Sequence, residues 1–134
     1  MRIMIRAQLA IVGLPQTGKT TLGNALAAHL GLGCCHTDQF MNVPWSEQAD
    51  EAMKYMPVRG IVEGITVARL FRRGFEPDCV VHLVSDPSWV RTGSMASLVR
   101  RGLSEYRGRV ITLPAKPKLT TALAALGGQA YDKL

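Results

Sequence analysis

The sequence contains the stretch Gly13-Leu14-Pro15-Gln16-Thr17-Gly18-Lys19-Thr20, which fills every fixed position of the pattern G-x-x-x-x-G-K-S/T. Before it, residues 7–12 form a short apolar run of the kind found in β-strands. After it, residues 20–30 carry apolar side chains at helical spacing, and Gly31 is a helix stop. The stretch therefore predicts a strand, a glycine-bounded turn and a helix in direct succession.

This succession is a candidate anion-binding site. Backbone N–H groups at such a turn converge on phosphate oxygens, and the helix dipole adds partial positive charge. The pattern assigns Lys19 to the β- and γ-phosphates of a nucleotide and the hydroxyl of Thr20 to Mg²⁺. We expect nucleotide contacts from the whole loop and from the next residue, Thr21. The sequence thus predicts a nucleoside triphosphate as ligand, ATP in the first place, with GTP as the alternative.

Length and composition indicate one globular domain that spans residues 1–134. Hydrophobic residues make up 47% of the chain, and no apolar run approaches the ~18 residues that cross a membrane. The three cysteines Cys34, Cys35 and Cys79 have a spacing that fits no disulfide framework. We therefore expect a cytoplasmic protein with reduced thiols and no membrane partner.

The charge is positive overall and concentrated in one part of the chain. The formal net charge is +6, and residues 91–118 contain seven basic side chains but a single acidic one, Glu105. Two interpretations remain open. We favour an enzyme that handles phosphorylated, anionic ligands; a surface for nucleic acid is the alternative.

Strand-like and helix-like segments alternate along the chain, which favours a parallel α/β sheet. We predict strands over residues 7–12, 33–37, 59–63, 79–84 and 109–113. We predict helices over residues 20–30, 47–56 with Ser46 as N-cap, 66–73, 87–106 with an interruption at Gly93, and 119–126. The expected fold is a three-layer α/β domain of the P-loop NTPase type, with a five-stranded parallel sheet and helices on both faces.

In open parallel sheets, ligands bind beyond the carboxyl ends of the strands. Besides the loop that begins at Gly13, the predicted strand ends point to Asp38, Glu63, Asp86 and the segment after Leu113. We therefore expect these residues to lie near the phosphate-binding loop.

Two of these strand ends carry a resemblance to a known family. The stretches His36-Thr37-Asp38-Gln39-Phe40 and Ile61-Val62-Glu63-Gly64-Ile65, together with the loop, resemble the small P-loop kinases of the uridine kinase, gluconate kinase and adenylate kinase type. The resemblance covers residues 7–113. It implies an ATP- and Mg²⁺-dependent transfer of the γ-phosphate to a hydroxyl group of a small molecule, for which we expect a nucleoside, a nucleotide or a sugar.

The resemblance also implies roles for the acidic residues. Asp38 is the candidate general base, or the group that orients the acceptor hydroxyl. Its alternatives are a metal-side acid and an Asx turn that closes the second strand. Glu63 is expected beside the loop, where it would hold Mg²⁺ together with Thr20; its alternative is an acid favoured at a helix N-terminus. Asp86 is the competing metal acid, although Pro87 after it also fits a helix cap.

The predicted catalytic set consists of Lys19, Asp38, Arg91, Arg100 and Arg101. The three arginines follow the fourth strand at positions similar to the lid arginines of these kinases, which clamp the transferring phosphate. Guanidinium groups suit the charge that develops on the phosphate oxygens. A solvated basic face is the alternative for each of them.

Other side chains fall near the expected acceptor. Arg69, Arg72 and Arg73 are candidates for acceptor contacts or for plain surface. Trp45 and Phe40 follow Asp38, where they would stack on a planar acceptor or cover apolar parts of the loop. Cys34, Cys35 and His36 invite a zinc interpretation, which we disfavour because neighbouring residues in a strand point to opposite faces.

The acceptor segment, residues 41–57, is short for a kinase of this type. A compact basic chain with a minimal acceptor pocket would suit a kinase that phosphorylates hydroxymethylated bases in DNA, as some phage enzymes do, and we keep this as the alternative function. A further alternative is a P-loop NTPase that transfers no phosphate. The sequence predicts no particular oligomeric state.

Overall fold

The computed structural model describes residues 7–40, 42–56, 59–84 and 93–127. Within these ranges the chain forms a five-stranded, all-parallel sheet with the strand order β2-β3-β1-β4-β5. The strands are β1 (Ala7–Gly13), β2 (Gly33–His36), β3 (Arg59–Glu63), β4 (Cys79–Val84) and β5 (Arg109–Pro114). The predicted fold class is confirmed, and each predicted strand agrees with the structure to within one residue.

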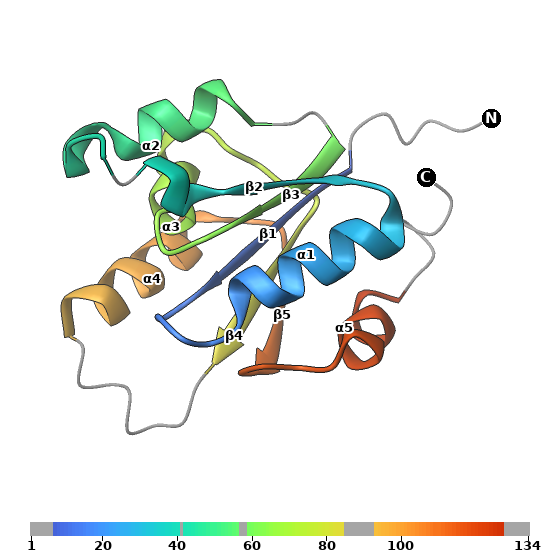
Figure 1. Cartoon of the computed structure of the whole chain (residues 1–134). Coiled ribbons are helices and arrows are strands. Elements are labelled where there is room, and N and C mark those ends of the chain that lie inside the picture. The colour runs from blue at the N-terminus through green and yellow to red at the C-terminus, as the bar shows by residue number, and fades with distance from the viewer. Residues whose placement is uncertain (1–6, 41, 57–58, 85–92, 128–134) are drawn as a thin grey trace.

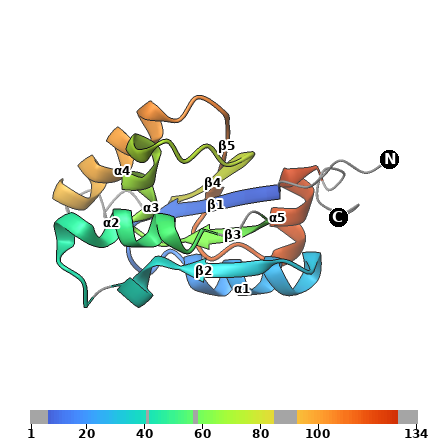
Figure 2. The same ribbon diagram turned by 90° about the horizontal axis from the view of Figure 1, so that it is seen from above.

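Helices cover both faces of this sheet (Figures 1 and 2). On one face lie α1 (Lys19–Leu30) and α5 (Leu119–Leu126). On the other face lie α2 (Trp45–Lys54), α3 (Val67–Leu70), which continues into the 3₁₀-helix η2 (Phe71–Arg73), and α4 (Gly93–Glu105). A second 3₁₀-helix, η1 (Thr37–Phe40), follows β2 directly. None of the helices in the described residues is both long and apolar enough to traverse a lipid bilayer.

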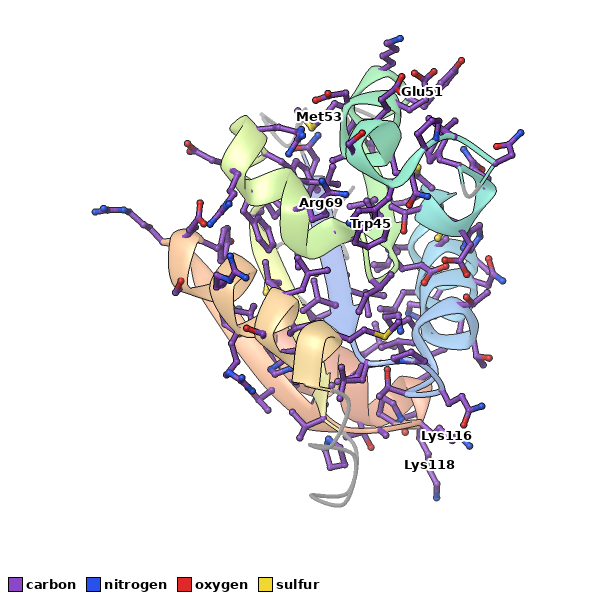
Figure 3. The ribbon with its side chains drawn as sticks, turned by 90° about the vertical axis from the view of Figure 1, so that its left-hand side faces the viewer. Trp45, Glu51, Met53, Arg69, Lys116 and Lys118 are labelled. Carbon is purple, nitrogen blue, oxygen red and sulfur yellow. The ribbon has the colours of Figure 1, made fainter. Side chains whose placement is uncertain are left out.

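The helices α3 and α4 pack closely against each other (Figure 3). A glycine on α4 makes this approach feasible, because a Cβ atom on Gly102 would lie only 2.4 Å from the backbone oxygen of Ala68. The two helices therefore meet backbone to backbone, with side chains of both helices flanking the contact.

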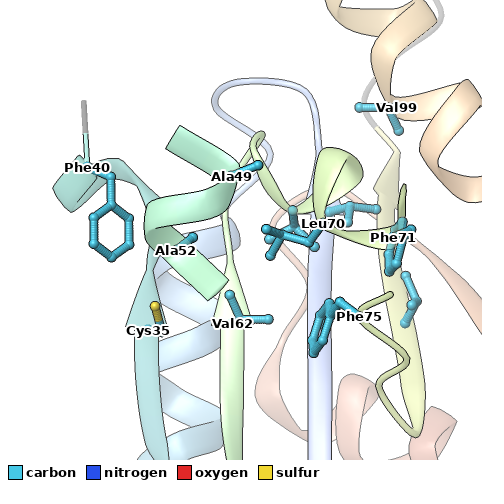
Figure 4. Packing of buried hydrophobic residues seen from close by; sticks show 13 residues of the cluster. Cys35, Phe40, Ala49, Ala52, Val62, Leu70, Phe71, Phe75 and Val99 are labelled. Atoms are coloured by element: carbon cyan, nitrogen blue, oxygen red, sulfur yellow. The ribbon is translucent and has the colours of Figure 1, made fainter. Parts of the chain in front are cut away.

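The alternation of side chains along β1 explains the two layers of core. Leu9 and Ile11 pack toward α1 and α5, whereas Ala10 and Val12 pack toward α2, α3 and α4, and all four are completely buried. Figure 4 shows the second layer, in which Val62, Leu70 and other apolar side chains fill the space between sheet and helices. A strand that is covered on both faces has to be apolar at successive positions, as β1 is.

The second helix differs most from the sequence prediction, and the other helix ends that the structure describes lie within one residue of it. The second helix begins at Trp45 and ends at Lys54, two residues earlier at each end than predicted, and its N-cap is Pro44 instead of Ser46. Proline has no N–H group to satisfy and a fixed φ, so it is well placed immediately before the first helical turn. The fourth helix is described only from Gly93 to Glu105; its predicted beginning at residue 87 lies outside the described residues.

The substitution Gly102→Ala tests the contact between α3 and α4. Alanine favours helix formation, but its methyl group would collide with Ala68, and such overpacking costs about 1–3 kcal/mol of unfolding free energy. Gly93→Ala, on the same helix, is the control, because a Cβ atom there meets nothing within 4 Å. Denaturant unfolding should show a loss for Gly102→Ala and none for Gly93→Ala; equal stability of the two variants would contradict the close approach.

Candidate active site

The loop between β1 and α1 lies at the carboxyl edge of the sheet. Gly18 is the N-cap of α1 in a left-handed conformation (φ 90°), and its carbonyl accepts a hydrogen bond from the N–H of Leu22 at 3.0 Å. Gln16, two residues earlier, also has a positive φ of 67°. Non-glycine residues seldom adopt this conformation, and such positions occur disproportionately at functional sites.

The loop is held together by contacts that converge on the carbonyl oxygen of Leu14. Both the hydroxyl of the buried Thr17 and the ammonium group of Lys19 donate hydrogen bonds to it at 2.8 Å. The chain after β5 supports the loop from outside, because the backbone N–H of Lys116 donates to the carbonyl of Thr17 at 2.8 Å. The strand-end rule pointed to the segment after Leu113, but no sequence signal singled out Lys116.

A cavity of about 430 Å³ opens next to the loop. It brings together residues of the loop, of η1, of the end of β3 and of α4. The residues that line it are Pro15, Gln16, Gly18, Lys19, Thr20, Thr21, Asp38, Glu63, Ile65 and Met95. The phosphate-binding loop and both predicted acidic residues therefore share one site.

Glu63 is the buried acid of this site, with 1% of its surface exposed. Its Oε2 atom accepts a hydrogen bond from the Thr20 hydroxyl at 2.9 Å. The same oxygen lies 2.5 Å from Nδ1 of His36, and the imidazole N–H donates to the carboxylate there. His36 and Glu63 are neighbours in the parallel register of β2 and β3. Sequence reasoning missed this pair, because it depends on which strands are adjacent.

The donor set around Glu63 fits a magnesium ion. A threonine hydroxyl and a carboxylate are hard oxygen ligands, and Mg²⁺ is commonly held by one or two such groups together with phosphate oxygens of a substrate. Among the described residues, no three side chains of His, Cys, Asp or Glu gather as an independent metal site. Thr20 and Glu63 are therefore the residues that would hold the metal, with a bound nucleotide completing its ligands.

Lys19 and Asp38 both line this cavity. Burial lowers the pKa of the Lys19 ammonium group, whereas the carboxylates of Glu63 and Asp38 act in the opposite direction. Asp38 itself lies in η1, is exposed, and makes no hydrogen bond to other described residues. The structure thus places Asp38 at the open side of the site, within electrostatic reach of Lys19.

Gly64 allows the segments that carry Asp38 and Glu63 to pack closely together. It follows Glu63 with a φ of 137°, and a Cβ atom at this position would lie 1.7 Å from the hydroxyl oxygen of Thr37. That hydroxyl donates a hydrogen bond to the Glu63 carbonyl at 3.1 Å. The absence of a side chain at residue 64 therefore lets η1, and with it Asp38, lie directly against the end of β3.

Of the predicted lid arginines, the two that lie in the described part of the chain, Arg100 and Arg101, do not line this cavity. Arg91 and the competing acid Asp86 lie outside the described residues. Arg100 is exposed on α4, and Arg101 lines a second cavity; neither borders the cavity at the loop. The residue of α4 that does border it is Met95, which sequence reasoning did not single out, because no local pattern shows how the helix is rotated against the sheet.

The two aromatic candidates differ in their surroundings. Phe40 is buried and stacks on Tyr55 with ring centroids 5.5 Å apart, so it belongs to the core and is not free to stack on an acceptor. Trp45 is 53% exposed, and the guanidinium group of Arg69 lies 4.7 Å from its ring centroid (Figure 3). Of these two side chains, Trp45 is the one whose ring is exposed enough to contact a ligand.

The adjacent cysteines lie on opposite faces of the sheet. Cys34 packs in the core layer of α1 and Cys35 in the layer of α2. Burial, with smaller contributions from Glu63 and Cys35, raises the pKa of the Cys34 thiol to about 12. Zinc binds cysteine as thiolate, so a thiol that holds its proton at neutral pH and points away from its neighbour is a poor ligand.

The fold is that of the small P-loop kinases. A sugar kinase from Janibacter sp. matches with 18% identity and a TM-score of 0.52, over 93% of this chain and 96% of its own. A gluconokinase from Sinorhizobium meliloti matches with 15% identity and a TM-score of 0.58, over 96% of each chain. A shikimate kinase from Bacteroides thetaiotaomicron matches with 13% identity and a TM-score of 0.52, over 96% of this chain and 99% of its own.

These likenesses are structural. The sequence significantly matches no protein-family model and no curated protein. At identities of 18% or less, the solved structures show that the fold is shared.

The substitution His36→Ala tests the hydrogen bond to Glu63. It would leave a buried carboxylate without one of its two donors, which costs about 1–3 kcal/mol of unfolding free energy. His29→Ala is the control, because His29 is exposed on α1 and surface changes of this kind stay within about 0.5 kcal/mol. Chemical denaturation compares the two; a loss no larger for His36→Ala than for His29→Ala would show that the bond does not stabilise the fold.

Proposed function

We propose that the protein is an ATP- and Mg²⁺-dependent kinase that transfers the γ-phosphate to a hydroxyl group of a small molecule. One observation carries the proposal: Lys19, Thr20, Asp38 and Glu63, which come from three separate parts of the chain, line a single cavity. These are the groups that phosphoryl transfer needs, namely a phosphate cradle, two metal ligands and a carboxylate for the acceptor.

The shared fold supports this proposal and suggests the acceptor class. The solved structures described above are named as kinases of a sugar, of gluconate and of shikimate. We therefore propose a hydroxyl-bearing metabolite as acceptor, with a nucleoside, a nucleotide or a sugar as the classes to be tested. We further propose ATP as donor, with GTP as the alternative nucleotide, and a cytoplasmic location in keeping with the reduced cysteines.

The loop would bind and polarise the phosphates. Its backbone N–H groups and the Lys19 ammonium group surround the space in which the β- and γ-phosphates would lie, and preorganised positive charge stabilises the charge that develops during transfer. Thr20 and Glu63 would hold Mg²⁺, which neutralises phosphate charge when it is bound. His36 keeps the Glu63 carboxylate oriented through its hydrogen bond to Oε2.

Asp38 would act on the acceptor. Its exposed carboxylate would accept a hydrogen bond from the attacking hydroxyl and take up its proton as the hydroxyl oxygen bonds to the γ-phosphorus. The bond from that phosphorus to the β–γ bridging oxygen would break in the same transfer, and ADP would leave. Of the three predicted lid arginines, Arg91 and Arg100 stay our candidates for contacts with the transferring phosphate, whereas Arg101 lines the second cavity and is given no catalytic role here. Arg91 lies outside the described residues.

Two substitutions separate nucleotide binding from transfer. Lys19→Ala should abolish transfer, because the phosphates lose their cation. Asp38→Asn should keep ATP binding and lower kcat by at least about 100-fold, the usual contribution of a general base. Glu47→Gln, an exposed carboxylate on α2, is the control. Labelled-ATP transfer to nucleosides, nucleotides and sugars, together with equilibrium ATP binding, measures both effects; full activity of Asp38→Asn would refute the assigned role.

A second pair of substitutions distinguishes the kinase from a hydrolytic NTPase. If Glu63 is the metal-side acid, Glu63→Gln should raise the Mg²⁺ concentration required for half-maximal activity, and Asp86→Asn should leave it unchanged. The reverse pattern, combined with ATP hydrolysis that no acceptor affects, would favour an NTPase that transfers no phosphate. Titration of activity against Mg²⁺ decides between them.

A further inference from the structure

A second cavity lies outside the proposed active site, between α3–η2 and α4. Its volume is about 330 Å³, and four arginines line it: Arg69, Arg72 and Arg73 from α3–η2, and Arg101 from α4. Ala68 and Gly102, the residues at which α3 and α4 approach closely, also line this cavity. The proposed catalytic mechanism uses none of these four side chains.

Positive charge in this cavity exceeds the negative charge around it. The Nε atoms of Arg72 and Arg73 donate to Glu105 and Asp50, each at 2.5 Å. Arg101 forms no ion pair with the described residues, and Arg69 donates to the backbone oxygen of Trp45 at 2.5 Å. Among the described residues, two of the four guanidinium groups, those of Arg69 and Arg101, thus form no ion pair with a carboxylate.

The arginines also lie close enough to repel one another. Burial and the neighbouring Arg73 cation lower the pKa of the Arg69 guanidinium, while Asp50 acts in the opposite direction. A bound anion would relieve this repulsion. Because the ion pairs of Arg72 and Arg73 engage Nε, both terminal nitrogens of each side chain can still donate to a ligand.

The size of the unbalanced charge favours a phosphate monoester over a carboxylate. A phosphate monoester carries a charge of about −1.5 to −2 at neutral pH and offers three strong acceptor oxygens. A carboxylate carries a single negative charge and is satisfied by one bidentate arginine. Two unbalanced guanidinium charges in one cavity match the phosphate.

Successive residues of the same two stretches of chain line the two cavities. On α4, Met95 borders the cavity at the loop, and Leu98 and Arg101 border the basic one. On the other side, Ile65 borders the first cavity and Arg69, four residues later, borders the second. Arg101 lies six residues after Met95, a rise of about 9 Å along a helix, which a ligand of nucleotide size can span.

Trp45 adds an aromatic surface next to the basic cavity. Its ring is half exposed and lies against Arg69 (Figure 3). An aromatic side chain beside a cationic phosphate site is the combination that proteins use to bind the base and the phosphate of a nucleotide.

We propose that the basic cavity binds a phosphate group of the acceptor, so that the acceptor is a nucleotide, free or within a nucleic-acid strand. This inference rests on the proposed kinase function and specifies its substrate class. Substitution of Arg101 tests phosphate binding most directly, because it breaks no ion pair among the described residues.

The test compares ligands with and without a phosphate. Calorimetry on the full chain, with ADP and Mg²⁺ present, measures the binding of dTMP, thymidine and a twelve-residue oligothymidylate. We expect dTMP to bind about 10- to 100-fold more tightly than thymidine, the effect of one charge-assisted hydrogen bond or more. Arg101→Glu should remove most of this preference. Arg107→Glu, the same charge change two residues beyond the end of α4 and outside the lining of the basic cavity, should keep it.

Each outcome has a defined meaning. Equal affinities for dTMP and thymidine, or equal losses in Arg101→Glu and Arg107→Glu, would overturn the inference. Tighter binding of the oligonucleotide that depends on Arg101 would support it and assign the phosphate to a nucleic-acid strand. Arg101→Ala serves as the second variant should Arg101→Glu fail to fold, as judged by circular dichroism.

The inference and the proposed kinase function fail in different ways. Transfer to thymidine or a sugar that is insensitive to Arg101→Glu would refute the nucleotide acceptor and keep the kinase. Phosphate-dependent binding through Arg101 without transfer to any acceptor would refute the kinase and keep the phosphate site.

Discussion

The hydrogen bond from the Thr20 hydroxyl to the Glu63 carboxylate joins the two halves of the site. It connects the first turn of α1 to the end of β3 and is possible only because β1 and β3 are adjacent and parallel, with Ile11 opposite Glu63. A carboxylate that is 1% exposed has to keep its hydrogen-bond donors, so this contact and the His36 contact constrain the loop, β2 and β3 together. The position of Asp38 follows from the same arrangement, through Gly64 and Thr37.

On the face of the sheet covered by α2, α3 and α4, residues of α4 line both the cavity at the loop and the basic cavity. Ile65 and Met95 line the cavity at the loop, and Arg69 and Arg101, which follow them along the chain, line the basic cavity. Trp45 on α2 lies against Arg69. The opposite face, covered by α1 and α5, is core. A buried apolar layer covers each face of the sheet, and the basic cavity opens between α3 and α4 beside their close contact.

Much of the fold could be predicted from local patterns. The loop motif, the five strands and the alternation of strands and helices came from glycine positions and apolar periodicity, which act over a few residues. Helix starts were less predictable, as at Trp45, where Pro44 and not Ser46 precedes the first turn. The arginine cluster could not be predicted from the sequence, because Arg69 and Arg101 are 32 positions apart. They line the same cavity because Gly102 allows α3 and α4 to pack closely.

By itself, the sequence determined that a phosphate-binding loop follows the first strand and that acidic residues end the next two strands. These features depend on residue types at short spacings, which the printed chain displays directly. Only the tertiary structure decided that His36 holds Glu63, that Lys116 supports the loop and that Met95, not Arg100 or Arg101, borders the first cavity. Strand order, parallel register and helix rotation bring these residues into contact, and they are set by packing across the whole sheet.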